Sequence, residues 1–363
     1  MVACRYGHAE IVRMLLDIGA DYNKCDNYGW SSIIFACRNG HTEIVKMLLD
    51  IGADYKKCSS DGLSPVMTVM VACRYGHTEI LRMLLDIGVD YDKCDSHGLS
   101  PLMSACSKGH TDILRMLLDK GADYNKCQND GSSPVMVACK EGNTKIVRML
   151  LDIGADYNKC KSNGWSPVLT ACRYGHTEIV KMLLDIGADY DKCDNDCWSP
   201  VMWACRYVHT DILRMLLDIG ADYDTCDNDG WSPVMYACRY GDTEIVRMLL
   251  DIGADYNKCN RDSWSPIMYA CRYGHTEIVR MLLDIGVDYN KCDNNGWTSV
   301  MSACRYGYSY IVRMLVDKGA DCDQCNSDGL SPVIIAAERG HNDIVSVLNE
   351  HSRKESGVCL TEY

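Results

Sequence analysis

Residues 230–262 read GWSPVMYACRYGDTEIVRMLLDIGADYNKCNRD, and the chain repeats this stretch on both sides. The next 33 residues, 263–295, read SWSPIMYACRYGHTEIVRMLLDIGVDYNKCDNN, and the preceding 33, 197–229, read CWSPVMWACRYVHTDILRMLLDIGADYDTCDND. Self-similarity at a fixed period of this length is typical of a stacked solenoid. The sequence therefore predicts a repeat array before any motif inside one repeat is considered.

Two short helices and a loop are predicted within each repeat. Ser232 followed by Pro233 indicates a helix start, because the hydroxyl accepts a free backbone N–H and proline suits the first helical position. Gly241 is expected to end this helix, Thr243 to cap the second helix, and Gly253 to end it. The segment that follows is rich in Asp and Asn and is predicted to be an extended turn. One repeat is too small to bury its apolar faces, so we expect stability to come mostly from interfaces between repeats.

The repeat resembles the ankyrin repeat, whose pattern is loosely D-x-x-G-x-T-P-L-H-x-A-A-x-x-G-H-x-E-I-V-x-L-L-L-x-x-G-A-D. Residues 227–255 read DNDGWSPVMYACRYGDTEIVRMLLDIGAD, and the match recurs from residue 1 to about residue 350. The resemblance implies an all-α solenoid of helix–turn–helix repeats with projecting β-hairpin-like loops. Met, Ile or Leu stands where the family has the first histidine of its pattern, so apolar packing must replace the hydrogen bonds of that side chain, and we expect a less rigid stack.

The domain organisation follows from the period. A length of 363 residues corresponds to about eleven repeats. We expect one array over residues 1–351, with residues 1–25 as a truncated first repeat, ten further repeats, and the last repeat as a carboxy-terminal cap. Residues 352–363 are expected to form a disordered tail. Because the first repeat lacks a polar capping face, the sequence favours a fragment of a longer chain.

One irregularity interrupts the period. The repeat starts at Gly62 and Gly98 lie 36 residues apart rather than 33. We expect the three extra residues, about one helical turn, to lengthen a first helix near Thr68, Val69 and Met70. A kink that bends the array and a tolerated duplication both fit this insertion, and we favour the duplication.

Charge and composition limit the classes of partner and compartment. The net charge of −13 argues against the phosphate backbone of a nucleic acid as the main partner. No apolar run approaches the roughly 18 residues of a membrane helix, so direct membrane insertion is not expected. The amino terminus, MVACRYGH, has neither the basic start nor the apolar segment of a secretory signal. We expect a monomer inside the cell, in the cytoplasm.

The chain has 23 cysteines, and most recur with the period. One row occupies the first helices and the other lies in the loops. The first-helix row consists of Cys4, Cys37, Cys73, Cys106, Cys139, Cys172, Cys205, Cys238, Cys271 and Cys304. Without a secretory signal, such a pattern fits reduced intracellular thiols better than a disulfide framework.

The sequence offers no sign of catalysis and implies no cofactor. It contains no phosphate-binding loop, nucleophile elbow or paired catalytic carboxylates, so we do not expect an enzyme. The sharpest alternative is zinc binding by the Cys-Arg-Tyr-Gly-His segments, such as Cys172 with His176. A glycine breaks the helix between the two residues and paired C-x-x-C spacing is lacking, so a core cysteine and a turn histidine are the favoured interpretation.

The candidate binding residues lie at the loop tips and on the exposed face of the first helices, where proteins of this family usually hold their partners. Tryptophan, tyrosine and arginine gather there between residues 165 and 306, on a face expected to be concave. The predicted contact residues are Trp165, Trp198, Trp203, Arg206, Trp231, Tyr236, Arg239, Trp264, Tyr269, Arg272 and Trp297. These residue types dominate interface hot spots. The alternative is that each tryptophan closes its loop by packing on the neighbouring repeat.

The sequence thus predicts a non-catalytic scaffold or adaptor that binds a protein partner through the concave face and the loop tips. The second hypothesis is that the array is the targeting segment of a larger enzyme, channel or ubiquitin-ligase adaptor whose catalytic part lies outside this chain. The identity of the partner does not follow from the fold, because one fold can carry many sites.

Overall fold

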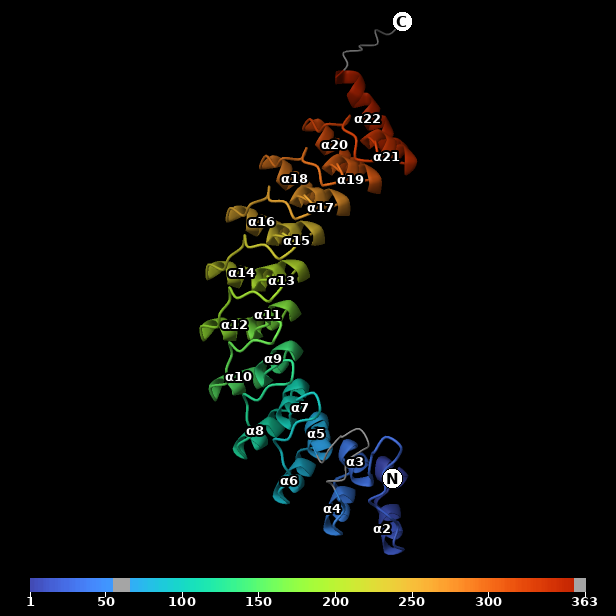
Figure 1. Ribbon diagram of the computed structural model, residues 1–363, viewed down its shortest axis with the longest axis vertical. Helices are drawn as coiled ribbons and strands as arrows, with labels where there is room; N and C mark the ends of the chain where they lie inside the picture. Colours follow the sequence, from blue (N-terminus) through green and yellow to red (C-terminus); the bar gives the residue numbers. More distant parts are fainter. Residues whose placement is uncertain (55–65, 356–363) are drawn as a thin grey trace. The chain divides into compact units, whose positions relative to one another are not determined.

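The computed structural model describes residues 1–54 and 66–355. In this part of the chain every regular element is an α-helix, and a first and a second helix alternate along the repeats (Figure 1). The predicted all-α fold of helix–turn–helix repeats is therefore confirmed. The chain divides into an amino-terminal half, Met1–Asp189, and a carboxy-terminal half, Tyr190–Tyr363.

In the amino-terminal half, the first helices form one row and the second helices form another (Figure 1). The first helices are α1 (Val2–Tyr6), α3 (Ser32–Arg38), α5 (Val66–Tyr75), α7 (Pro101–Lys108), α9 (Pro134–Glu141) and α11 (Pro167–Tyr174). The second helices are α2 (Ala9–Asp17), α4 (Thr42–Asp50), α6 (Thr78–Asp86), α8 (Thr111–Asp119), α10 (Thr144–Asp152) and α12 (Thr177–Asp185). Each first helix contacts its successor in the row and the second helix of its own repeat.

The carboxy-terminal half has the same two rows. Its first helices are α13 (Pro200–Tyr207), α15 (Pro233–Tyr240), α17 (Pro266–Tyr273), α19 (Ser299–Tyr306) and α21 (Pro332–Glu338). Its second helices are α14 (Thr210–Asp218), α16 (Thr243–Asp251), α18 (Thr276–Asp284), α20 (Ser309–Asp317) and α22 (Asn342–Glu355).

The first helices begin as the Ser-Pro pattern predicts. Ser232 is the N-cap residue of α15, its hydroxyl accepts the backbone N–H of Met235 at 3.4 Å, and Pro233 is the first helical residue. The same arrangement begins α7, α9, α11 and α13. The serine satisfies a backbone donor that the helix itself leaves unpaired, so the local sequence alone fixes where this helix starts.

The prediction that Thr243 caps the second helix is wrong. Asp242 is the N-cap residue of α16, and its carboxylate accepts the backbone N–H of Ile245 at 2.7 Å. Thr243 is the first helical residue. In most other repeats a histidine holds the N-cap position without capping the helix through its side chain.

That histidine contacts the turn of the preceding repeat instead. His275 Nε2 lies 3.1 Å from the carbonyl oxygen of Arg239. The equivalent contact joins His41 to Arg5, His77 to Arg38, His110 to Arg74 and His176 to Lys140. The ring sits so close that a Cβ atom on Gly241, where φ is +83°, would lie 2.3 Å from the ring of His275. Glycine therefore suits this turn for its backbone conformation and for the space it leaves.

One turn departs from this arrangement in two places at once. Val208, with φ of +59°, stands where the other turns of the carboxy-terminal half have glycine. In the next repeat the N-cap residue is Asp242, which has no ring and caps its own helix. A bulky residue in the turn thus coincides with a short side chain opposite it.

The core lies between the two rows and between successive repeats. Ile245, Val246 and Leu249 of α16 are fully buried, as are Ala237 and Cys238 of α15. The methionines in the family's histidine position are buried as well, namely Met103, Met136, Met202, Met235, Met268 and Met301. The side chain of Met67 lies outside the described residues. Apolar packing therefore replaces the expected hydrogen bonds at these positions, as predicted, whereas Ile334 at the same position of the last repeat is exposed.

The loops and the carboxy terminus refine two expectations. In the described residues the loops carry only isolated β-bridges, Cys25 with Ser31 and Cys292 with Thr298, rather than strands. The last helix, α22, continues through Glu355, so the expected tail is helical over residues 352–355, and residues 356–363 lie outside the described part.

The irregular repeat behaves as the insertion predicts. Helix α5 has 10 residues, whereas the first helices of the next two repeats, α7 and α9, have 8. The repeat start at Gly62 lies outside the described residues. Within the described residues the helix is two residues longer, and Thr68 and Val69 are fully buried within it.

A matched pair of glycine substitutions tests the turn contact. Gly241 and Gly253 both have positive φ, but a Cβ on Gly253 meets nothing within 4 Å. Each change to alanine should cost roughly 1–2 kcal/mol of backbone strain. Gly241→Ala should cost about 1 kcal/mol more, because it displaces His275 from the Arg239 carbonyl. Chemical denaturation measures both, and equal losses would contradict the argument.

The cysteine rows predict a pattern of thiol reactivity. Burial raises the pKa of the first-helix cysteines from Cys37 to Cys304 well above the ordinary value, which disfavours the reactive thiolate. Iodoacetamide at neutral or mildly alkaline pH should therefore modify the exposed loop residues Cys292 and Cys325 but not that row. Peptide mass spectrometry should show the row modified only after unfolding. Labelling of the row in the native protein would contradict the buried placement.

Candidate functional site

In the carboxy-terminal half the loop tryptophans stack against the first helices. The ring of Trp231 lies 5.0 Å from Tyr236 of its own repeat and 4.3 Å from Tyr269 of the next. Trp198 lies 4.3 Å from Trp203 and 4.6 Å from Tyr236. We call Trp198, Trp203, Trp231, Tyr236, Trp264 and Tyr269 the aromatic ladder. Trp198 and Trp231 pack on the neighbouring repeat, as the alternative interpretation of the sequence expects.

Burial divides the aromatic ladder into inner and outer residues. Trp203, Tyr236 and Tyr269 have exposed fractions of only 6%, 5% and 6%. The loop tryptophans are half-buried. Three of the predicted contact residues are therefore core residues, because the loop tryptophans cover them, and the prediction that they contact a partner directly is corrected.

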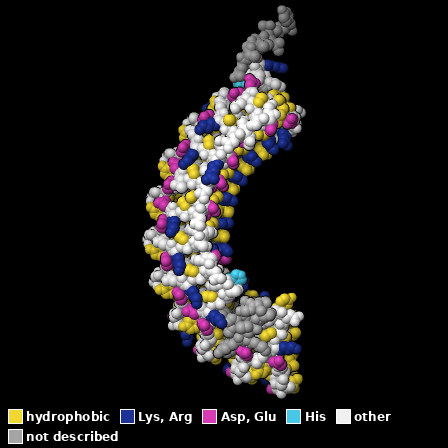
Figure 2. Space-filling model, viewed as in Figure 1, with side chains coloured by type: hydrophobic (Ala, Val, Ile, Leu, Met, Phe, Trp, Pro, Cys, Tyr) yellow, Lys and Arg dark blue, Asp and Glu magenta, His cyan; other side chains and the backbone are white. Residues whose placement is uncertain are grey.

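An outer layer of arginine and tyrosine covers the ladder. The guanidinium carbons of Arg206, Arg239 and Arg272 lie 5.1, 5.2 and 5.2 Å from the ring centroids of the tryptophans of their own repeats. Each guanidinium also faces a tyrosine of the next repeat, at 6.0 Å for Tyr240, 5.6 Å for Tyr273 and 5.8 Å for Tyr306. These tyrosines are about two-fifths exposed. Figure 2 shows Lys or Arg side chains alternating with hydrophobic side chains along one edge of the molecule.

The buried carboxylate of Asp227 fixes a loop tip and the side chain of Tyr236. Asp227 Oδ1 accepts the backbone N–H groups of Asp229 and Trp231 at 2.9 Å, which fixes the loop, and Oδ2 accepts the hydroxyl of Tyr236 at 2.5 Å. Burial, the hydrogen bond to Asp227 and the charge of Asp227 raise the pKa of Tyr236 far above its ordinary value. In the next repeat Asn260 takes the same position and donates to the hydroxyl of Tyr269 at 3.0 Å.

The two outermost predicted tryptophans have different surroundings. Trp297 packs with Arg305 at 5.2 Å, and Ser302 stands where the ladder has an aromatic side chain. A hollow of about 170 Å³ opens beside Ser302 between Trp264 and Trp297. Trp165 belongs to the amino-terminal half, where Arg173 lies 5.0 Å from its ring.

A cleft lies in the amino-terminal half, where the aromatic packing is interrupted. Leu99 and Ser132 replace the loop tryptophan in two successive repeats, and Ser104 and Val137 occupy the first-helix position that Tyr236 holds in the ladder. A cleft of about 590 Å³ opens there, with Leu99, Ser132, Ser104 and Val137 among its lining residues. We call it the amino-terminal cleft.

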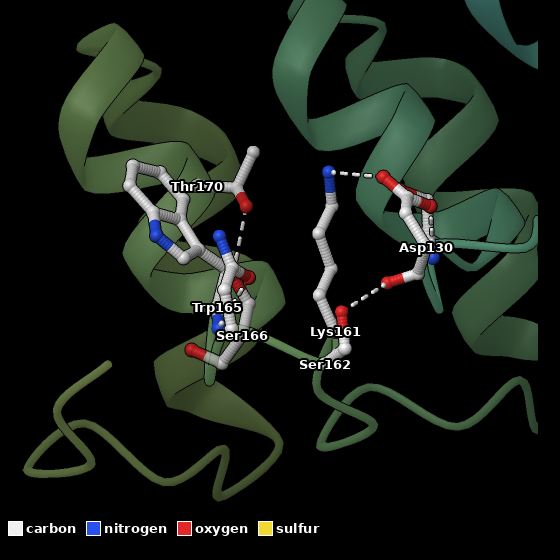
Figure 3. A network of polar contacts seen from close by, with 8 residues as sticks. Asp130, Lys161, Ser162, Trp165, Ser166 and Thr170 are labelled. Atoms are coloured by element: carbon white, nitrogen blue, oxygen red, sulfur yellow. Dashed lines mark hydrogen bonds and ion pairs between the residues drawn. The ribbon is translucent and has the colours of Figure 1, made fainter. Parts of the chain in front are cut away.

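Polar contacts order one wall of this cleft (Figure 3). Lys161 Nζ lies 3.1 Å from Asp130 Oδ2 of the preceding loop, and the hydroxyl of Ser162 donates to the Asp130 carbonyl at 3.3 Å. Partial burial opposes ionisation of Asp130, but the hydrogen bonds from Ser132 and Lys161 outweigh it and lower the pKa of that carboxyl. Trp165 rises from the same loop as Lys161 and lines the cleft.

Comparison with known proteins agrees with these repeats. The family model of ankyrin repeats (3 copies) matches residues 1–59, 57–128, 123–194, 186–260 and 252–325. The chain belongs to the ankyrin repeat family. The crystal structure of the human ASB11 ankyrin repeat domain is similar, with 24% identity and a TM-score of 0.56 over 61% of this chain and 98% of that one, which shows the shared fold. No curated protein sequence matches the chain.

The ankyrin repeats described here offer no obvious metal centre or membrane helix. Cys172 is fully buried, whereas His176 Nε2 lies 3.2 Å from the carbonyl of Lys140, so the two side chains serve different contacts. Over residues 1–54 and 66–355, no group of three or more His, Cys, Asp or Glu side chains is placed to hold a metal ion. In the same residues no helix is both long and apolar enough to cross a membrane.

The sequence predicted one lining residue of the amino-terminal cleft, Trp165, but not the cleft itself. The cleft opens where small side chains such as Ser104 and Ser132 replace the aromatic residues of other repeats. The signal was nevertheless in the sequence: the usual Arg-Tyr pair after the first-helix cysteine is Ser107-Lys108 in one repeat and Lys140-Glu141 in the next. A break in a repeated pattern thus located an opening that the pattern itself conceals.

Two conservative substitutions test the hydrogen bond between Tyr236 and Asp227. Tyr236→Phe removes a donor to a buried carboxylate and should destabilise the protein by about 1.5–3 kcal/mol. Tyr269→Phe removes an acceptor of a neutral amide and should cost only about 0.5–1.5 kcal/mol. Urea denaturation of both variants gives the comparison, and a larger loss for Tyr269→Phe would refute the role of Asp227.

Proposed function

We propose that this chain is a non-catalytic adaptor that binds a protein partner through the outer layer of the aromatic ladder and the adjoining loop tips. Ankyrin repeats are in general protein-interaction modules. The observation that supports this face is the placement of Arg206, Arg239 and Arg272 between a tryptophan and the next tyrosine. Tryptophan, tyrosine and arginine are enriched among residues that carry binding energy.

The packing of the layer favours binding for an energetic reason. A free arginine loses side-chain entropy when it is immobilised at an interface, at a cost of about 0.5–1.5 kcal/mol. Here the guanidinium of Arg239 already lies against Trp231 and Tyr273. The contact surface is therefore arranged before a partner arrives. The exposed tyrosines Tyr207, Tyr240, Tyr273 and Tyr306 extend this surface.

The test replaces arginines in matched positions of the same three repeats. The layer variant carries Arg206→Ala, Arg239→Ala and Arg272→Ala. The control carries Arg214→Ala, Arg247→Ala and Arg280→Ala on the exposed side of the second helices, with the same change in charge. Circular dichroism verifies that both variants are folded.

The measurement is an affinity capture from source lysate, read by mass spectrometry. We expect wild type and control to retain a common partner and the layer variant to recover at least roughly tenfold less of it, since hot-spot truncations cost about 2 kcal/mol or more. Equal recovery by both variants would assign the layer a purely structural role.

A further inference from the structure

The amino-terminal cleft differs in shape from the aromatic ladder. In the carboxy-terminal half, Trp203, Tyr236 and Tyr269 fill the space beneath the loop tips. At the equivalent position the cleft has Ser104, Val137 and Thr170, which are too small to fill it. Its volume of about 590 Å³ falls within the usual range of ligand pockets, roughly 300–1,000 Å³.

The cleft also differs in charge. Its lining includes five basic residues, Arg74, Lys108, Lys140, Lys161 and Arg173, against the two acids Asp130 and Glu141. Lys161 is paired with Asp130, whereas Lys108 and Lys140 are exposed and form no ion pair within residues 1–54 and 66–355. The protein as a whole has a net charge of −13. A concave basic site on an acidic protein concentrates the electrostatic attraction for an anionic ligand there.

The remaining lining residues suit a polypeptide. Gln128 and Asn163 offer amide groups that can bind a backbone, and the half-buried ring of Trp165 forms an apolar wall. A nucleic acid fits less well, because two carboxylates lie within the cleft and the protein has a net charge of −13. The shape, the charge and the mixed lining together indicate one class of ligand.

We propose that the amino-terminal cleft binds an acidic, extended peptide segment of a protein partner, with Lys108 and Lys140 neutralising its carboxylates. This site is separate from the outer layer of the aromatic ladder and rests on the proposed function only in taking the ligand to be a protein. Val137 also lines the cleft, so a bulky side chain there should exclude the segment while leaving the charges in place.

The first experiment selects peptides from a random dodecapeptide phage library on the immobilised full chain. The cleft variant is Lys108→Gln with Lys140→Gln. The control is Lys46→Gln with Lys181→Gln, which removes two exposed charges from second helices of the same half. We expect Asp and Glu to be enriched in peptides selected by wild type and control, and not in those selected by the cleft variant. No acidic enrichment with wild type, or equal enrichment with all three proteins, would overturn the proposal.

The second experiment measures the affinity of the most enriched peptide, labelled with fluorescein, by fluorescence anisotropy. The cleft variant should bind roughly 5- to 30-fold more weakly than the control, as expected for two lost ion pairs. Val137→Trp should abolish binding while circular dichroism and the melting temperature show a folded protein. Unchanged binding to Val137→Trp would show that the peptide sits outside the cleft.

Two further measurements separate this site from competing explanations. A single-stranded oligonucleotide that binds more tightly than the peptide, and loses affinity in the cleft variant, would replace the proposal with nucleic-acid binding. The Arg206→Ala, Arg239→Ala, Arg272→Ala protein should bind the acidic peptide as wild type does. If that variant loses the lysate partner and keeps the peptide, the two sites are independent, and a loss of both would refute a separate cleft site.

Discussion

Contact between successive repeats is the interaction on which the whole structure depends. Leu249 and Val246 of α16 and Cys238 of α15 are fully buried, and both helices contact helices of the neighbouring repeats. The polar contacts obey the same logic, since His275 reaches the Arg239 carbonyl of the repeat before it. Stability in such an array is approximately a sum of local and nearest-neighbour contributions.

The same nearest-neighbour rule shapes the candidate binding surface. A loop tryptophan covers the first-helix aromatic residue of its own repeat and contacts that of the next, so Trp231 packs on both Tyr236 and Tyr269. Where the first-helix residue is small, as at Ser104, Val137 or Ser302, a hollow remains. The chain thus presents a filled aromatic surface in one half and an open basic cleft in the other, through changes at a few equivalent positions.

Much of the fold could be predicted from the sequence because its determinants are local and repeated. The Ser-Pro starts, the glycine ends and the apolar spacing each act within a few residues, and the structure reproduces them. The cap of α16 was misassigned to Thr243 because the preceding position usually carries a histidine that serves the previous repeat. That role is invisible until two repeats are placed side by side.

The candidate site was harder to predict for a related reason. Residue type points to Arg206, Arg239 and Arg272, which are half-buried beside aromatic rings, but it does not separate Tyr236, which is covered, from Tyr240, which is exposed. Residue type also fails to reveal empty space. The turn at Val208 shows what the pairing between repeats implies for inheritance. At the equivalent turn of the next repeat, a Cβ atom on Gly241 would collide with the ring of His275. Val208 has a Cβ, and the residue that corresponds to this histidine is Asp242, which has no ring. Repeats are thus not interchangeable modules, and a duplication or exchange at this junction must carry both residues together.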